Sequence, residues 1–176
     1  MNQRILMRQD EIDLALRRIA LQILEKNHQA PRLAVVGIHT CGVFLARRLR
    51  DIISRDLRHP VDYGDLDINL YRDDWSLVSQ NPVVRTTDIP FEVNDSALVL
   101  VDDVIFTGRT IRAAMDAIMD FGRPRAVQLA VLVDRGGREL PIQPDYTGLC
   151  ATVLPHERIA VRLAAGDENL VVIEGE

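Results

Sequence analysis

The sequence contains two cysteines, a single lysine and a single tryptophan, and it has no long apolar run. Cys41 and Cys150 lie far apart, outside any CxxC motif and away from histidine-rich segments, which excludes a disulfide framework and a structural zinc site. No stretch approaches the roughly 18 consecutive apolar residues that a membrane-spanning helix requires, and the first residues lack the apolar block of a signal peptide. We therefore expect a cytoplasmic protein that has no association with membranes.

The scarcity of lysine also limits which phosphate-binding motifs the chain can contain. Its basic side chains are 20 arginines and Lys26, set against 26 acidic residues, and the formal net charge is -5. This balance argues against indiscriminate nucleic-acid binding, although it leaves room for a local basic patch. Gly37 and Gly42 have the spacing of a P-loop, but Val43 and Phe44 follow where that motif requires a lysine and a hydroxyl residue. The Rossmann GxGxxG motif and the late-strand lysine of receiver domains are absent as well.

The apolar residues instead follow an alternation of helices and strands. A length of 176 residues with 47% hydrophobic content fits one globular domain, residues 1–176. Helical spacing predicts helices at residues 10–27, 43–53 and 110–122, and short apolar runs predict strands at residues 33–38, 97–103 and 126–134. This order predicts an α/β fold, in which helices cover both faces of a parallel twisted sheet. Ligands of such sheets bind beyond the carboxyl ends of the strands, here near residues 37–42, 102–110 and 134–138.

Three further segments have weaker patterns. Residues 61–72 are predicted to form a pair of strands. The polar, proline-containing residues 73–90 are predicted to form a mobile loop, either a functional lid or a variable part of the surface. Short strands are expected in the tail at residues 151–154, 159–163 and 170–174.

The segment at residues 98–110, LVLVDDVIFTGRT, ends in a turn that is suited to a phosphate. The N-terminus of the helix that follows offers unpaired N–H groups and the positive end of the helix dipole. Gly108 permits close approach of the backbone, and Thr107 and Thr110 add hydroxyl donors. Arg109 adds either a cation or only its backbone amide. The turn therefore predicts a site for a phosphate monoester.

Two adjacent carboxylates precede this turn. Asp102 and Asp103 are acceptors at the distance of a sugar ring from the turn, and vicinal ribose hydroxyls are matching donors. Alone, Thr110 would more often be a helix cap, and the aspartates would more often be solvated acids at a strand end. Their combination in one segment, after consecutive apolar residues, favours a site for a ribose 5-phosphate.

Residues 98–110 also match the 13-residue signature of type I phosphoribosyltransferases, which consists of an apolar strand, an acidic pair and a TGxT turn. The segments VGIHTCGVFLARRL, DINLYRDD, DIP and GRPRAVQLAVLVDRGGRELPIQPDYTG resemble the bacterial pyrimidine-operon regulators, RNA-binding attenuators that are also uracil phosphoribosyltransferases. The resemblance covers residues 12–148 and, more weakly, the tail. It implies the type I phosphoribosyltransferase fold and the Mg²⁺-dependent conversion of uracil and phosphoribosyl pyrophosphate to UMP and pyrophosphate.

The resemblance also implies roles for individual residues. Asp102 and Asp103 would act in catalysis by holding the ribose hydroxyls, and they would approach Mg²⁺ through the ribose or the pyrophosphate. The substrate-binding positions form three groups, for the pyrophosphate, for the 5-phosphate turn with the residues before it, and for the base. They are Thr40, Cys41, Gly42 and Arg72; Val104, Ile105, Phe106, Thr107, Gly108, Arg109 and Thr110; and Val133, Asp134 and Arg135. Phe106 stands where purine transferases of this class have an aspartate, which favours a pyrimidine.

The pyrophosphate loop departs from the family pattern. Where the family has Thr-Arg-Gly, this chain has Thr40, Cys41 and Gly42. An arginine would supply donors beside a highly charged leaving group, but backbone N–H groups can still bind pyrophosphate. We therefore expect reduced rather than absent transferase activity, with Cys41 acting as a small neutral replacement.

The RNA surface of the family is also altered. Of the positions implied for RNA binding, Arg17, Arg18 and Arg138 remain, while Gly137 and Leu149 stand where the family has a histidine and a lysine. An alternative hypothesis is therefore an RNA-binding attenuator of the pyrimidine operon that senses UMP or UTP and has weak or lost transferase activity. The substituted pyrophosphate loop favours this regulator, and the weakened basic positions favour the enzyme. The resemblance implies a homodimer or homotetramer in either case.

Overall fold

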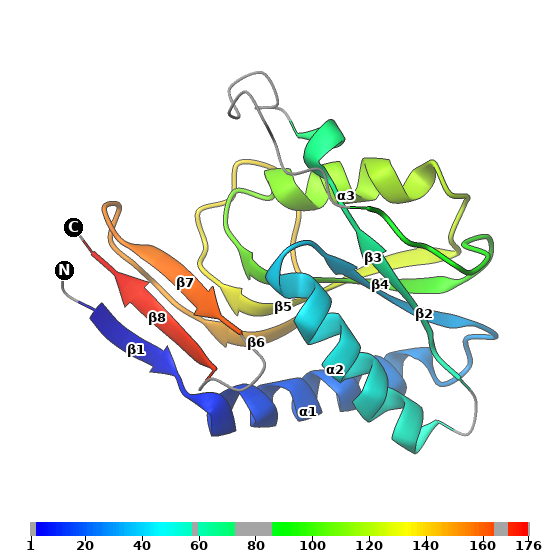
Figure 1. Cartoon of the computed structure of the whole chain (residues 1–176), viewed down its shortest axis with the longest axis horizontal. Helices are drawn as coiled ribbons and strands as arrows, with labels where there is room; N and C mark the ends of the chain where they lie inside the picture. Colours follow the sequence, from blue (N-terminus) through cyan, green and yellow to red (C-terminus); the bar gives the residue numbers. More distant parts are fainter. Residues whose placement is uncertain (1–2, 58–59, 73–85, 164–168, 176) are drawn as a thin grey trace.

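The computed structural model describes residues 3–57, 60–72, 86–163 and 169–175, and its main feature is a five-stranded parallel sheet (Figure 1). The strand order is β3-β2-β4-β5-β6, and every neighbouring pair runs parallel. The bounds are β2 Leu33–Ile38, β3 Asp62–Leu66, β4 Ala97–Ile105, β5 Ala126–Asp134 and β6 Tyr146–Cys150. The strands predicted at residues 33–38 and 126–134 are confirmed, and the strand predicted at residues 97–103 continues to Ile105.

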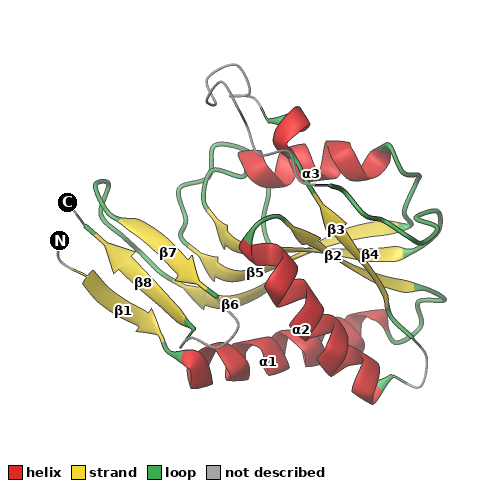
Figure 2. Ribbon diagram, in the orientation of Figure 1, coloured by secondary structure: helices red, strands yellow, loops and turns green. Residues whose placement is uncertain are grey.

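Helices cover both faces of this sheet, as the alternation of elements predicts (Figure 2). Helices α1 (Gln9–Asn27) and α2 (Cys41–Asp56) pack on one face, and α3 (Arg109–Met119) packs on the other. Alternate side chains of a strand serve the two faces: in β4, Val99 belongs to the core under α1 and α2, and Leu100 to the core under α3. Each such buried side chain stabilises the fold by about 2 kcal/mol. None of the helices in the described ranges is long and apolar enough to cross a membrane.

A second, antiparallel sheet brings the two ends of the chain together (Figure 1). Its strands lie in the order β1-β8-β7, with bounds β1 Gln3–Met7, β7 Arg158–Arg162 and β8 Leu170–Glu174. The tail strand predicted at residues 170–174 is confirmed, and the one predicted at residues 159–163 is displaced by one residue. Residues 151–154 form no strand, and neither β1 nor β6 is predicted by the sequence patterns.

The prediction of a strand pair at residues 61–72 is wrong. Strand β3 forms, but the chain then turns into a short 3₁₀ helix, η1 (Asn69–Tyr71). The Asp67 carboxylate accepts a hydrogen bond from the Asn69 backbone N–H at 3.0 Å, a local turn that ends the extended conformation. Residues 73–85 of the predicted mobile loop lie outside the described residues, while Asp88 in its last part bridges to Asp65 of β3.

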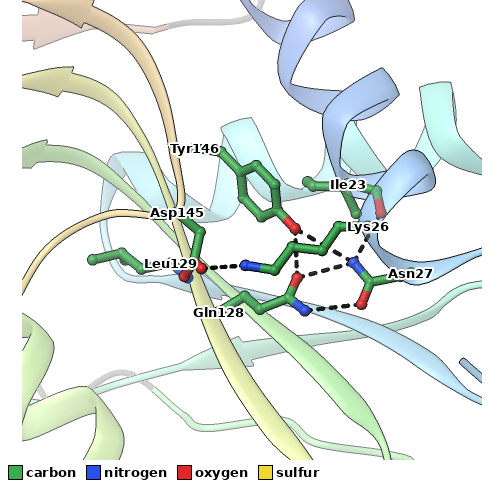
Figure 3. Close-up of polar contacts among 7 residues, drawn as sticks. All are labelled: Ile23, Lys26, Asn27, Gln128, Leu129, Asp145 and Tyr146. Atoms are coloured by element: carbon green, nitrogen blue, oxygen red, sulfur yellow. Dashed lines mark hydrogen bonds and ion pairs between the residues drawn. The ribbon is translucent and has the colours of Figure 1, made fainter.

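A buried polar cluster at the amino end of β5 ties α1 to the sheet (Figure 3). The side-chain amides of Gln128 and Asn27 exchange two hydrogen bonds, both 2.9 Å long, and the Gln128 oxygen also accepts one from the Tyr146 hydroxyl at 2.6 Å. Burial raises the pKa of Tyr146 to about 12, so its hydroxyl stays protonated. Next to the cluster, Lys26 of α1 forms an ion pair with Asp145 (Figure 3). These contacts fix the end of α1 on β5 and β6.

Candidate active site

The carboxyl ends of β2, β3 and β4 surround a cavity of about 470 Å³. The loop after β2 contributes His39, Thr40 and Cys41, the segment after β3 contributes Asp67, Ile68, Asn69 and Arg72, and β4 with the start of α3 contributes Asp102, Asp103, Val104 and Thr110. His39, Asp67, Ile68 and Asn69 are not among the predicted site residues. For Asp67, the missed signal was its position directly after a strand of the parallel sheet. The other lining residues were predicted, and the cavity brings them together.

The acidic pair lies on one wall of this cavity. Asp102 is only 6% exposed, and its carboxylate accepts a hydrogen bond from the Asp103 backbone N–H at 2.9 Å. The Asp103 carboxylate accepts one from the Val104 N–H at 2.8 Å. Burial, together with the neighbouring charge of Asp103, raises the pKa of Asp102 well above its usual value. The backbone hydrogen bonds therefore fix the two carboxyl groups side by side, where vicinal hydroxyls of a ligand can form hydrogen bonds with them.

The phosphate turn connects β4 to α3 through a glycine in the left-handed conformation. Gly108 has a φ of +92° and precedes the first residue of α3, so the first helical turn, whose N–H groups have no acceptor within the helix, begins directly after it. The Thr107 hydroxyl oxygen accepts a hydrogen bond from the Arg109 backbone N–H at 3.3 Å. The Arg109 guanidinium forms an ion pair with Glu139, with 2.7 Å between Nε and Oε2. Both groups of Arg109 that could bind a phosphate therefore have partners in the protein, the backbone N–H at Thr107 and the guanidinium at Glu139.

The first residues of α2, which follow the loop after β2, lie close against β4. A Cβ on Gly42 would lie 2.4 Å from the Val101 carbonyl oxygen, so a side chain at this position would push α2 away from the sheet. Thr40 and Cys41 line the cavity, whereas Gly42 is buried. The Cys41 thiol lies 3.6 Å from the carbonyl oxygen of Val161 in β7, and it therefore also contacts the antiparallel sheet.

The segment after β5, residues 134–140, holds the phosphate turn from the other side, and we call it the brace. The Arg135 backbone N–H donates to the Ile105 carbonyl oxygen at 3.1 Å. The N–H groups of Glu139 and Leu140 both donate to the Thr107 carbonyl oxygen, at 2.9 and 3.1 Å. The end of β4 and the turn after it are thus fixed to the brace by backbone hydrogen bonds.

Arg138 is the central side chain of the brace. Its guanidinium donates to the carbonyl oxygens of Phe106 at 3.0 Å and Ile142 at 2.9 Å, and it forms an ion pair of 2.7 Å with Asp134. The two charged side chains are 12% and 17% exposed. Burial acts to raise the pKa of Asp134, but hydrogen bonds from Arg138 and the Gly136 N–H outweigh it, so this pKa lies below its usual value. Asp134, which is expected beside the base, forms its ion pair with Arg138.

Comparisons with known proteins agree with this geometry. The model of the phosphoribosyl transferase domain family matches residues 3–165. The chain is 51% identical over 172 residues to the bifunctional protein PyrR of Syntrophobacter fumaroxidans, covering 97% of this chain and 92% of the relative. It is 46% identical over 175 residues to the bifunctional protein PyrR of Bacillus subtilis, covering 98% of this chain and 97% of the relative. The chain belongs to the PyrR family of phosphoribosyltransferases.

Solved structures of other phosphoribosyltransferases share the fold of this PyrR family member. The hypoxanthine phosphoribosyltransferase of Trypanosoma cruzi superimposes with a TM-score of 0.71 at 20% sequence identity, covering 98% of this chain and 97% of the other. A hypoxanthine-guanine phosphoribosyltransferase of Bacillus anthracis gives a TM-score of 0.65 at 17% identity, covering 90% of this chain and 87% of the other. At these identities the likeness concerns the fold alone, and it confirms the predicted type I phosphoribosyltransferase architecture.

A second cavity of the PyrR family member, of about 600 Å³, lies between the phosphate-turn segment and the antiparallel sheet. Phe106 and Arg135 line one side, and the tail contributes Pro155, His156, Glu157, Arg158, Glu174 and Gly175. The Arg135 guanidinium lies over the Phe106 ring, 4.0 Å from its centroid. Val133 and Ile105 are buried in the two cores and line neither cavity. Of these tail residues, those at positions 155–158 were missed because their segment has little periodicity.

The arginines expected to bind RNA differ in exposure. Arg17 and Arg18 lie on the exposed side of α1, and Arg18 donates to the carbonyl oxygens of Thr147 and Gly148 in β6. Arg138, in contrast, is occupied within the brace. Of the three arginines expected to bind RNA, Arg17 and Arg18 are therefore the two that lie on the exposed surface of this PyrR family member.

Proposed function

We propose that this protein transfers the 5-phosphoribosyl group of phosphoribosyl pyrophosphate to uracil, giving UMP and pyrophosphate. The observation that carries the proposal is the cavity in which the pyrophosphate loop, the acidic pair and the first turn of α3 meet. These three parts match the three parts of a phosphoribosyl pyrophosphate molecule: the leaving group, the ribose and the 5-phosphate. The bifunctional PyrR relatives and the phosphoribosyl transferase domain support the same activity.

In the proposed reaction, the bond between ribose C1 and the pyrophosphate oxygen breaks, a bond from C1 to uracil N1 forms, and the proton of N1 passes to the departing pyrophosphate. Positive charge develops on the ribose and negative charge on the pyrophosphate. Asp102 and Asp103 accept hydrogen bonds from the ribose hydroxyls and favour the cationic sugar. The turn at residues 107–110 holds the 5-phosphate, while the N–H groups at residues 40–42 and Arg72 hold the pyrophosphate.

Mg²⁺ is the proposed cofactor, and the residues present fit a cation that is shared with the substrate. In the described ranges, no group of three or more His, Cys, Asp or Glu side chains could hold a metal ion. Mg²⁺ prefers phosphate oxygens and needs only one or two protein carboxylates. Asp102, Asp103 and Asp67 provide carboxylates at the cavity wall. When bound, Mg²⁺ would neutralise charge on the leaving pyrophosphate.

The second cavity is the proposed site of the base. Phe106 offers an aromatic face, and Arg135 beside it offers N–H donors that match the carbonyl oxygens of uracil. Phe106 belongs to the same strand end as the acidic pair, so a base in contact with its ring would lie next to the ribose. Asp134 supports this arrangement through Arg138 rather than by contact with the base.

The transferase activity is tested by measuring UMP formation from uracil and phosphoribosyl pyrophosphate with Mg²⁺, using cytosine and hypoxanthine as competing bases. We expect UMP formation and no comparable reaction of the other bases. Thr110→Val removes a hydroxyl from the phosphate turn and should raise the KM for phosphoribosyl pyrophosphate by about tenfold. The matched control Thr152→Val, at an exposed threonine outside both cavities, should leave it unchanged. Stabilisation by UMP without any turnover would contradict the enzyme and favour a regulator that only senses nucleotides.

A second proposed function is binding of pyrimidine-operon leader RNA, favoured by the bifunctional names of the relatives and by the exposed Arg17 and Arg18. Filter binding with the organism's own leader RNA should show an affinity that depends on UMP or UTP. The double variant Arg17→Ala/Arg18→Ala should weaken it and reduce its dependence on salt, whereas Arg123→Ala/Arg125→Ala, at exposed arginines elsewhere, should not. Absence of nucleotide-dependent affinity at moderate salt would remove this function. Assembly into homodimers or homotetramers and a cytoplasmic location complete the proposal.

A further inference from the structure

Two successive glycines in the brace have the same backbone conformation but different surroundings. Gly136 has a φ of +74° and Gly137 a φ of +76°, so any side chain at either position would be strained to a similar degree. A Cβ built on Gly136 meets nothing within 4 Å. A Cβ on Gly137 would lie 2.5 Å from Cε2 and 3.0 Å from Cδ2 of Phe106. The space beside Gly137 is thus taken by the Phe106 ring.

The same ring carries the Arg135 guanidinium. The 4.0 Å between the guanidinium carbon and the ring centroid is the geometry of a cation–π contact. Within the described ranges, the contact with the Phe106 ring is the interaction that holds the Arg135 side chain. The Arg135 backbone N–H is held separately, by its hydrogen bond to the Ile105 carbonyl oxygen. Phe106 is 43% exposed although it is a large apolar side chain. An exposed ring is therefore held between Gly137 and Arg135, with ring and guanidinium both on the wall of the second cavity.

We propose that Gly137 is a positioning residue for recognition of the base. In this chain, in which Gly137 replaces the histidine of the family, the missing Cβ lets the Phe106 ring lie in the position that supports the Arg135 guanidinium, and the two side chains together form one wall of the base cavity. A guanidinium stacked on a ring directs its N–H donors outward in its own plane, as recognition of a planar base with carbonyl oxygens requires. This inference rests on the proposed function, since it assigns the second cavity to the base.

The pair Gly137→Ala and Gly136→Ala tests the inference, because both variants carry the same backbone strain and only one displaces the ring. We expect Gly137→Ala to raise the KM for uracil by about tenfold relative to Gly136→Ala, the effect of a misplaced pocket wall. The KM for phosphoribosyl pyrophosphate and the thermal midpoint should agree between the two variants. Equal KM values for uracil in both variants, with an active wild type, would overturn the role of Gly137.

A double-mutant cycle with Phe106→Leu separates the contact with the ring from other effects of Gly137→Ala. In the Phe106→Leu background, Gly137→Ala should cost no more than Gly136→Ala does, because the atoms that the new Cβ would meet in the ring are gone. Crystal structures of the two alanine variants add a readout that needs no turnover: the ring should move only in Gly137→Ala, and an unmoved ring would refute the inference. An inactive wild type that binds no UMP would instead refute the proposed function, and the assigned role of Gly137 with it.

Discussion

At the amino end of β5, the Gln128 amide is surrounded by the side chains of Asn27 and Tyr146, whereas near the carboxyl end of the neighbouring strand Asp102 faces a cavity. Both groups are buried, at 7% and 6% exposure. The amide finds protein partners for its donor and its acceptor atoms, but the carboxylate receives one backbone hydrogen bond from Asp103, the very residue whose charge opposes it. Buried polar groups at one end of the sheet therefore hold the fold together, while those at the other end remain available to a ligand.

The same contrast explains why the acidic pair has an energetic cost. A buried carboxylate beside a second carboxylate destabilises the folded state unless a cation or a hydrogen-bond donor arrives. Within the described ranges, no ion pair of Asp102 compensates for it. The fold tolerates this arrangement because buried apolar side chains elsewhere in β2, β4 and β5 offset its cost, and the substrate would supply the missing donors.

The largest effect is expected for Asp102→Asn. It should lower kcat/KM for UMP formation by about 1000-fold, or about 4 kcal/mol, because it removes negative charge from the side of the developing cationic sugar. Stability in urea should be unchanged or higher, since a neutral amide is less costly to bury beside Asp103. The control Asp145→Asn removes a carboxylate at the other end of the sheet and should leave kcat/KM unchanged. If Asp102→Asn were active but less stable than the wild type, Asp102 would stabilise the fold rather than serve the ligand, which would contradict the contrast with Gln128.

The opposite result is expected for Gln128→Leu in the polar cluster (Figure 3). This substitution leaves the Asn27 amide and the Tyr146 hydroxyl without their buried partner, and it should lower the free energy of unfolding by about 3 kcal/mol. Tyr146→Phe removes one hydroxyl and should cost about 1 kcal/mol. Below their midpoints of urea unfolding, both variants should form UMP at the wild-type rate. A selective loss of activity would mean that the cluster positions the active site as well.

The sequence predicts the cavity at the carboxyl end of the sheet better than its surroundings. Asp102, Asp103 and the phosphate turn lie in one continuous segment, so their proximity follows from local geometry and needs no tertiary information. Asp67 enters the same cavity from another strand, and its place depends on the strand order β3-β2-β4, which no local pattern encodes. Strand β1 has few buried side chains and is defined by its pairing with β8 at the far end of the chain. The sequence analysis places Arg138 on the RNA-binding surface, because the sequence does not reveal its contacts with Asp134 and with the Phe106 carbonyl oxygen.

The Asp134–Arg138 pair lies at the same end of the sheet as Asp102, but its two charges are partners of each other. Asp134→Asn therefore tests whether a paired buried charge at this end stabilises the fold, as the Gln128 cluster does at the other end. Asp134 has a pKa below its usual value of 3.8, and it therefore stabilises the fold at pH values above 3.8. This contribution is lost as the pH falls through the lower pKa of the folded state. At neutral pH, Asp134→Asn should lower the free energy of unfolding by about 2 kcal/mol, the value of a hydrogen bond to a charged group. Urea titrations should show the difference from wild type shrink at acidic pH, and a difference independent of pH would contradict a role for the charge.

The smallest effect is expected for Cys41→Arg in the pyrophosphate loop. The Cys41 thiol supplies no strong donor to the cavity, and its sulfur lies against the Val161 carbonyl oxygen. An arginine there would add N–H donors beside the pyrophosphate, and it should lower the KM for phosphoribosyl pyrophosphate by about fivefold, or about 1 kcal/mol. The same substitution at the exposed Cys150 outside both cavities, Cys150→Arg, should change neither KM nor kcat. Equal rates of UMP formation by wild type and Cys41→Arg would mean that the backbone N–H groups of the loop already bind the leaving group. The pyrophosphate site would then resemble the phosphate turn, where the first turn of α3 offers backbone N–H groups to a ligand.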